Sequence, residues 1–134
     1  MELITKMKIN GTPKLIYSAF LDASKMSNFW FSDFKGEFKE GNEMILIYKE
    51  YNAEIKIKVT HISENELIEF MWDDRTVTIR FENINNETIV TAIEKHFIPE
   101  DIDNLLGQKE GWVYMLSCLK AYIEYDVSIR AALL

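Results

Sequence analysis

The sequence predicts an α+β fold in which one long C-terminal helix packs across an antiparallel sheet of six to seven strands, with two short helices near the N-terminus. Three observations predict it. Apolar residues recur at three- and four-residue spacing between residues 108 and 126, which is typical of an amphipathic helix. Between residues 35 and 98, short alternating runs are typical of strands. Most of these runs are joined by only two or three polar residues, which is enough only for antiparallel hairpins.

The length and composition fit one folded domain spanning residues 1–134. Of the 134 residues, 48% are hydrophobic and 28% charged, so the chain can bury a sizeable core. The net charge is −7 and no basic patch is segregated, so we expect neither nucleic acid nor an anionic membrane as a partner. The first residues show no signal-peptide pattern, and no apolar run approaches the roughly 18 residues that span a bilayer. We therefore expect a cytoplasmic protein.

The N-terminal part is expected to form one strand and two short helices. Residues 2–10 alternate and predict the strand. Thr12 can cap a helix and Pro13 fits its first position. The buried stripe of that helix is expected to contain Leu15, Ile16, Ala19 and Phe20. Asp22 predicts the cap of the second helix. The apolar face of the second helix is expected to contain Met26, Phe29 and Trp30.

The remaining strands and the long helix follow in order. The strands are expected at residues 34–39, 44–50, 53–63, 66–72, 76–84 and 87–98. A link over residues 99–107 then leads to the long helix at residues 108–126, which would be about 28 Å long. Its apolar stripe is expected to contain Trp112, Met115, Leu116, Leu119, Tyr122 and Ile123. Cys118 lies in the middle of this helix and is expected to be a small packing residue rather than a nucleophile.

Two-residue loops at residues 64–65, 73–74 and 85–86 would fix the register of four strands. The cross-strand pairs predicted for the inner face are Val59–Phe70, Phe70–Val77, Val77–Glu94, His61–Ile68, Ile68–Ile79, Ile79–Ala92 and Phe81–Val90. The opposite face is predicted to be mostly polar, with Lys56, Lys58, Thr60, Glu69, Thr78, Arg80, Glu82, Thr91 and Lys95, and with Leu67, Met71, Ile89 and Ile93 among them. One wet face is typical of an antiparallel sheet that is covered by a helix on its other side.

The same register predicts a polar cluster at one end of the inner face. Trp72 would lie opposite Arg75, Arg75 opposite His96, and Glu94 diagonal to Arg75. The chain leaves the sheet at this end and returns as the long helix, so Trp112 should lie over the same place. Apolar walls with a few convergent polar groups are typical of a small-molecule pocket. We therefore expect these five residues to meet at one mouth of the groove between sheet and helix.

Each of these residues also has a structural interpretation. Glu94 either contacts a ligand or forms only a structural ion pair with Arg75. His96 is either a general base or a solvated residue at the end of a strand, and His61 is expected at the edge of the core. The tryptophans are large packing residues that can also line a cavity.

The sequence shows no motif that is typical of a metal site, a phosphate site or a covalent nucleophile. Two distant histidines without cysteine or carboxylate partners at ligand spacing argue against a zinc site. No glycine-rich loop follows a strand, and no serine or cysteine has a convincing base beside it. We therefore expect no metal and no cofactor.

Several motifs, in their order along nearly the whole chain, resemble a known superfamily. They are residues 12–22, Phe29-Trp30, the glycine-flanked segment 36–41, the strand 67–72 ending in Trp72, the strand 87–97, and Gly111-Trp112 with Leu116, Leu119 and Tyr122. Together they resemble the helix-grip fold of the START-like (SRPBCC) superfamily. Within it, the chain is similar to the C-terminal domain of activators of the heat-shock chaperone ATPase. The resemblance implies a curved sheet and a deep cavity that relatives use for apolar ligands, and in some relatives for cyclase or hydrolase chemistry.

Three hypotheses about function follow. The first is a binding protein for a small, largely apolar molecule, with Glu94 and Arg75 orienting its polar end. The second is a cavity enzyme with Glu94 or His96 as acid or base. The third is a protein-interaction module that regulates a chaperone ATPase. We expect a monomer, or a homodimer formed through Leu67, Met71, Ile89 and Ile93. The residues expected to line the ligand site are Trp30, Phe38, Phe70, Trp72, Arg75, Ile79, Glu94, His96, Trp112, Met115 and Leu119.

Overall fold

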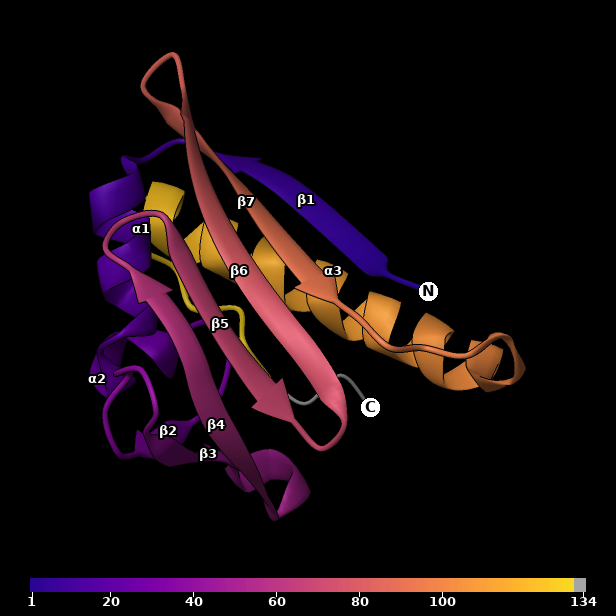
Figure 1. Ribbon diagram of the computed structural model, residues 1–134. Coiled ribbons are helices and arrows are strands. Elements are labelled where there is room, and N and C mark those ends of the chain that lie inside the picture. The colour runs from indigo at the N-terminus through magenta and orange to yellow at the C-terminus, as the bar shows by residue number, and fades with distance from the viewer. Residues whose placement is uncertain (132–134) are drawn as a thin grey trace.

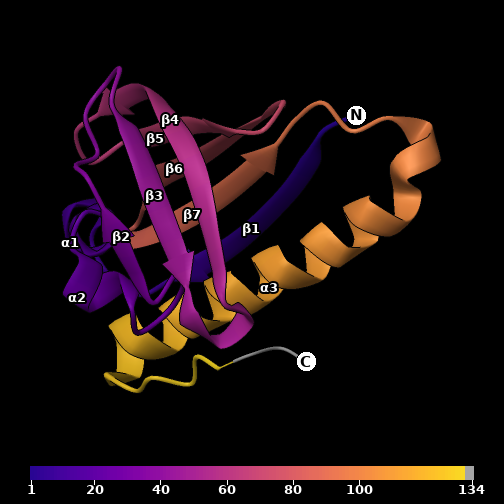
Figure 2. The ribbon, with the colours of Figure 1, turned by 90° about the horizontal axis from the view of Figure 1, so that it is seen from below.

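A computed structural model describes residues 1–131, and the last three residues of the expected domain lie outside that part. Its centre is a seven-stranded antiparallel sheet that curves around the long helix α3 (Figures 1 and 2). The strands are β1 (Leu3–Ile9), β2 (Asp33–Lys35), β3 (Glu43–Tyr48), β4 (Ala53–Ser63), β5 (Leu67–Trp72), β6 (Arg75–Ile84) and β7 (Glu87–Glu94). Their order across the sheet is β1-β7-β6-β5-β4-β3-β2. The predicted α+β class, with one sheet, two short helices and one long helix, is confirmed.

The two short helices begin where their caps predict. They are α1 (Pro13–Phe20) and α2 (Ala23–Met26). The hydroxyl of Thr12 accepts a hydrogen bond from the Leu15 amide at 3.2 Å, and the Asp22 carboxylate accepts one from the Ser24 amide at 2.9 Å. The expected burial of Leu15 is wrong, because its side chain is 51% exposed. It lies outside the face on which Ile16, Tyr17, Ala19 and Phe20 are buried.

The predicted register holds for β5, β6 and β7 and fails at one position in β4. The pairs Val59–Phe70, Phe70–Val77, Val77–Glu94, Ile68–Ile79, Ile79–Ala92 and Phe81–Val90 are all present. The pair His61–Ile68 is wrong. A bulge between Val59 and His61 adds one residue to β4, so that His61 lies opposite Glu69 and Ile62 opposite Ile68. His61 therefore turns to the outer surface, where its Nδ1 lies 2.8 Å from a Glu40 carboxylate oxygen.

The chain between β2 and β4 departs from two long predicted strands. β2 ends at Lys35, because Gly36 adopts φ +105°, a left-handed conformation that interrupts a strand. β3 ends at Tyr48 and continues as the 3-10 helix η1 (Lys49–Tyr51).

The long helix α3 (Ile102–Tyr125) begins earlier than predicted and has 24 residues, so it is about 36 Å long. The predicted link at residues 99–107 is wrong, because Pro99–Asp101 forms the 3-10 helix η2 and the rest belongs to α3. Gly107 and Gly111 lie inside the helix. Each helical glycine costs only about 1 kcal/mol relative to alanine, which tertiary packing of the helix offsets.

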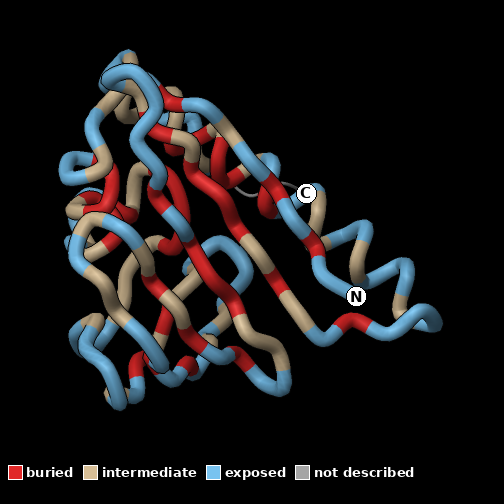
Figure 3. The backbone as a smooth tube through the Cα atoms, turned by 45° about the horizontal axis from the view of Figure 1, so that its top comes forward, coloured by how far each residue is buried: buried red, intermediate tan, exposed pale blue. Residues whose placement is uncertain are grey.

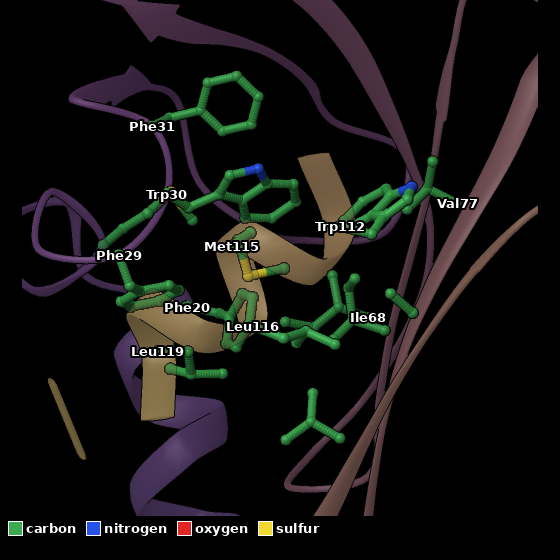
Figure 4. Packing of buried hydrophobic residues seen from close by; sticks show 14 of the residues in the cluster. Phe20, Phe29, Trp30, Phe31, Ile68, Val77, Trp112, Met115, Leu116 and Leu119 are labelled. Carbon is green, nitrogen blue, oxygen red and sulfur yellow. The ribbon is translucent and has the colours of Figure 1, made fainter. Parts of the chain in front are cut away.

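The core lies between the inner face of the sheet and helices α1, α2 and α3 (Figure 4). Along the central strands, buried positions alternate with more exposed ones (Figure 3). The largest fully buried side chains of the core include Phe20, Phe29, Phe70, Ile68, Leu116 and Leu119. Cys118 is also fully buried, and burial raises the pKa of its thiol.

The outer face of the sheet is less exposed to solvent than the alternation of polar and apolar residues predicts. Thr78 and Thr91 point away from the core but are only 4% and 5% exposed. Thr78 lies between Glu69 and Ile93 in the sheet and donates a hydrogen bond to the Glu69 carboxylate at 3.3 Å. The longer neighbours cover the short threonine, so the expectation that this position is solvated is wrong.

None of the helices described within residues 1–131 combines the length and the apolar character that spanning a bilayer requires.

Candidate functional site

A buried carboxylate surrounded by hydrogen-bond donors lies at the end of β7. The Glu94 side chain is 0% exposed. The indole nitrogen of Trp112 donates to its Oε1 at 2.8 Å, and that of Trp72 donates to its Oε2 at 3.2 Å. The Gln108 amide donates to both oxygens at 3.1 and 3.2 Å, and Arg75 Nε lies 2.9 Å from Oε2. Every polar group that faces the carboxylate is a donor, so both oxygens act as acceptors.

The fold brings these residues together from three places in the sequence. Trp72 and Arg75 flank the tight β5–β6 turn and pair directly. Glu94 is the last residue of β7 and lies on the same inner face. Gln108 and Trp112 are four residues apart in α3, so they lie on the same side of the helix, one turn apart. The cluster therefore fastens the first half of α3 to the end of the sheet.

Arg75 connects this cluster to the chain that follows β7. Its guanidinium lies 3.7 Å from the Asp101 carboxylate as well as beside Glu94. The same guanidinium lies over the Phe97 ring, 4.8 Å from its centroid. Burying a carboxylate is costly unless it is paired and hydrogen-bonded, and here both conditions are met.

A cavity of about 480 Å³ lies beside the cluster, between α3 and the adjoining ends of β3, β4 and β5. Half of the residues that line it are aromatic. The rings of Trp72 and Trp112 stack, with centroids 5.6 Å apart. The centroid of the Trp30 ring lies 5.6 Å from that of the Trp112 ring, and both rings are seen in Figure 4. The lining residues are Trp30, Phe31, Tyr48, Tyr51, Ala53, Ile55, Trp72, Asp73, Arg75, Gln108, Gly111, Trp112, Tyr114 and Met115.

The charged and amide side chains of the cavity lie at the end next to the Glu94 cluster. Arg75 and Gln108 line the cavity and bind Glu94, whereas Glu94 itself does not line it. Asp73, in the β5–β6 turn, supplies the other charged side chain of the lining. A ligand in the cavity would therefore contact Arg75 and Gln108, which bind Glu94, and would not contact Glu94 itself.

The opposite wall is supported by the segment that follows α3. The Arg130 side chain donates to the carbonyl of Trp30 and lies over the Tyr48 ring, 5.1 Å from its centroid. The Tyr114 hydroxyl donates to the carbonyl of Ile129 at 3.1 Å. Burial raises the pKa of the Tyr48 phenol.

The structure divides the eleven residues expected at the site into three groups. Those that line the cavity are Trp30, Trp72, Arg75, Trp112 and Met115. Those that are fully buried in the core, outside the lining, are Phe70, Ile79 and Leu119. The other three are Glu94, which is buried beneath the polar end, and Phe38 and His96, which do not line the cavity. The Phe38 ring packs on Phe34, with centroids 5.3 Å apart.

The expected place of His96 beside Arg75 is wrong. β7 ends at Glu94, and His96 has φ +75°, a left-handed conformation that breaks the strand alternation. The His96 side chain is exposed as a result, and Phe97 occupies the buried position beneath Arg75. An acid–base role finds little support in this geometry, because His96 faces solvent and both Glu94 oxygens already accept hydrogen bonds.

The sequence analysis did not place Gln108, Tyr48 or Tyr51 at the site. Gln108 precedes Trp112 by one helical turn, a signal that becomes useful once α3 is known to extend through both residues. Tyr48 and Tyr51 reach the cavity because η1 turns the chain there, and a periodic pattern does not reveal such a turn. Within residues 1–131, no three His, Cys, Asp or Glu side chains are grouped as metal ligands would be.

Comparisons with known proteins agree with this fold. Residues 10–124 match the family model described as Activator of Hsp90 ATPase homolog 1-like protein. The protein SSP2350 from Staphylococcus saprophyticus is 45% identical in sequence, with a TM-score of 0.92 over 98% of each chain. The Aha1 dimer from Colwellia psychrerythraea is 17% identical, with a TM-score of 0.83 over 93% of this chain and 97% of that one. CalU16 from Micromonospora echinospora is 16% identical, with a TM-score of 0.79 over 96% and 77%. No match was found among curated proteins.

Proposed function

The chain belongs to the Activator of Hsp90 ATPase homolog 1-like family of the START-like superfamily, and on this premise we propose that it is a cytoplasmic binding protein for a small, largely apolar molecule. The ligand would occupy the cavity between the sheet and α3. Its apolar body would contact the aromatic walls, and its polar end would lie near Arg75 and Gln108.

One observation carries the proposal, namely the aromatic cavity of about 480 Å³ with its charged and amide side chains at one end. Small-molecule sites are typically concave, roughly 300–1,000 Å³ in volume, and apolar apart from a few placed polar groups.

In this proposal Glu94 is a positioning residue. It binds the indole nitrogens of Trp72 and Trp112 and so fixes the orientation of two rings that line the cavity. It also holds the Arg75 and Gln108 side chains at the polar end. This role differs from the expectation that Glu94 itself orients the ligand.

A thermal-shift screen tests the proposal. The panel should contain fatty acids, flavonoids, sterols, aromatic acids, aromatic amines and polyketide-like compounds. A ligand at 100 times its dissociation constant stabilises a protein by about 2.7 kcal/mol, which is a shift of several degrees for a domain of this size. A reproducible shift that is confined to one chemical class would support the proposal.

Two helical glycines provide a matched pair of variants for the same screen. Both lie inside α3, and a Cβ placed on either would contact nothing within 4 Å, but only Gly111 lines the cavity. Gly111→Leu should abolish the ligand-induced shift by filling the cavity, whereas Gly107→Leu should keep it. Both variants should gain about 0.5–1 kcal/mol from helix propensity, so a loss of binding would not reflect a loss of folding. Equal ligand shifts in both variants would place binding outside this cavity.

A further inference from the structure

The aromatic walls of the cavity present many ring faces to an occupant. All three tryptophans of the chain line it, together with one phenylalanine and three tyrosines. The face of an aromatic ring carries partial negative charge, so it attracts a cation that lies within about 6 Å of its centre. The chain already uses one of these rings in this way, because the Arg130 guanidinium lies 5.1 Å from the Tyr48 centroid.

The charges of the lining also favour a cation. Only two lining residues carry charge, Asp73 and Arg75. Arg75 is neutralised by Glu94 at 2.9 Å, and Asp101 lies 3.7 Å from the same guanidinium. Within the described residues, the Asp73 carboxylate makes no hydrogen bond or ion pair. Two carboxylates thus lie beside the guanidinium at this end, and the carboxylate of Asp73, an exposed residue, is unpaired.

An anion would be poorly accommodated by these groups. It would approach the unpaired Asp73, the Gln108 amide already donates to both Glu94 oxygens, and the Arg75 guanidinium already lies beside the carboxylates of Glu94 and Asp101. The net charge of −7 also lowers the concentration of anions near the surface and raises that of cations.

We infer that the cavity binds an organic cation, an amine or a quaternary ammonium group carried on an apolar or aromatic body. This inference rests on the proposed function and names its ligand class. The cationic group would lie between the Asp73 carboxylate and the ring faces of the wall, and the apolar body would fill the remaining volume.

Three probes with the same carbon skeleton test the inference: phenylpropylammonium, the neutral phenylpropanol and the anionic phenylpropanoate. Binding can be followed by tryptophan fluorescence, because all three tryptophans line the cavity. The ammonium probe should bind about 10-fold more tightly than the alcohol, the size expected for a partly desolvated cation–π contact, and the carboxylate should bind most weakly. Added salt should weaken binding of the ammonium probe and leave that of the alcohol unchanged.

Substitutions at two neighbouring positions distinguish a local effect of the Asp73 carboxylate from an effect of the protein's net charge. Asp73→Asn should remove most of the preference for the ammonium probe, whereas Asp74→Asn should retain it, because Asp74 does not line the cavity. Both variants change the net charge equally. Asp73 has φ +52°, which asparagine tolerates as readily as aspartate, so Asp73→Asn should fold normally.

The outcomes distinguish this inference from the proposed function. If the alcohol binds as tightly as the ammonium probe, the cavity binds apolar molecules but the inferred charge preference is wrong. An equal loss of preference in both aspartate variants would also overturn it, because the cation would then respond only to total charge. If none of the three probes binds, the inference fails, and the proposed function fails with it unless the thermal-shift panel identifies another class.

Discussion

Glu94→Gln is the substitution that probes the polar cluster most sharply. The change keeps the size of the side chain but replaces one acceptor oxygen with a donor group. Depending on the amide orientation, that donor would face two or three groups that themselves donate. Trp112 and Gln108 face one oxygen, and Trp72, Arg75 and Gln108 face the other. Arg75, whose side chain is 18% exposed, would also lose its nearest negative charge.

The expected loss follows from the burial of this pair. Removing one partner of a buried ion pair typically costs about 3–5 kcal/mol, because an uncompensated charge remains. For a domain of this size, that loss corresponds to a decrease in melting temperature of about 10–20 °C. Equilibrium unfolding in urea, followed by tryptophan fluorescence, would measure the free-energy change as a lower midpoint at an unchanged slope.

Glu69→Gln is the matched control on the outer face of the sheet. Glu69 also accepts two hydrogen bonds, from Thr60 at 2.9 Å and Thr78 at 3.3 Å, but it is only half-buried and its partners are neutral. Its substitution should cost less than about 1 kcal/mol. If Glu94→Gln were equally mild, Glu94 would not be the buried centre of the cluster, and its role in holding both tryptophans would be refuted.

Three further substitutions or treatments test the packing. Leu119→Ala should destabilise by about 2–5 kcal/mol in urea unfolding, because Leu119 is fully buried, and a loss below about 0.5 kcal/mol would contradict the packing of α3. Thr78→Lys should cost about 1–3 kcal/mol, since this outer-face position is 4% exposed, and an unchanged melting temperature would show that the position is solvated. Burial raises the pKa of the Cys118 thiol, so a thiol reagent at mildly alkaline pH should label it only when the protein unfolds, and rapid labelling of the folded protein would show an accessible thiolate.

The sheet end of the site could be predicted because strand alternation and short turns determine register. Trp72, Arg75 and Glu94 meet as expected, since two tight turns leave little freedom in how β5, β6 and β7 pair. The same reasoning failed for His61 because a bulge shifts the alternation by one residue, and nothing in the local pattern marks it.

The helix end of the site was harder to predict because it depends on backbone conformations that the pattern does not reveal. The His96 side chain points outward because the backbone of His96 itself has a positive φ. Gln108 joins the cluster because α3 continues through Gly107, which as a glycine is also compatible with a break in the helix. The cavity itself is a volume that side chains leave unfilled, and alternation indicates which side chains face inward but not how completely they fill the space.

The most direct test of ligand binding in the cavity is an NMR titration that follows the indole N–H signals of Trp30, Trp72 and Trp112. Two of these N–H groups bind Glu94, and all three rings line the cavity. We expect at least one apolar probe to shift these signals saturably in the native protein, and not in the Gly111→Leu variant. Unmoved indole signals with every probe, or equal shifts in the filled variant, would contradict a ligand site between the sheet and α3.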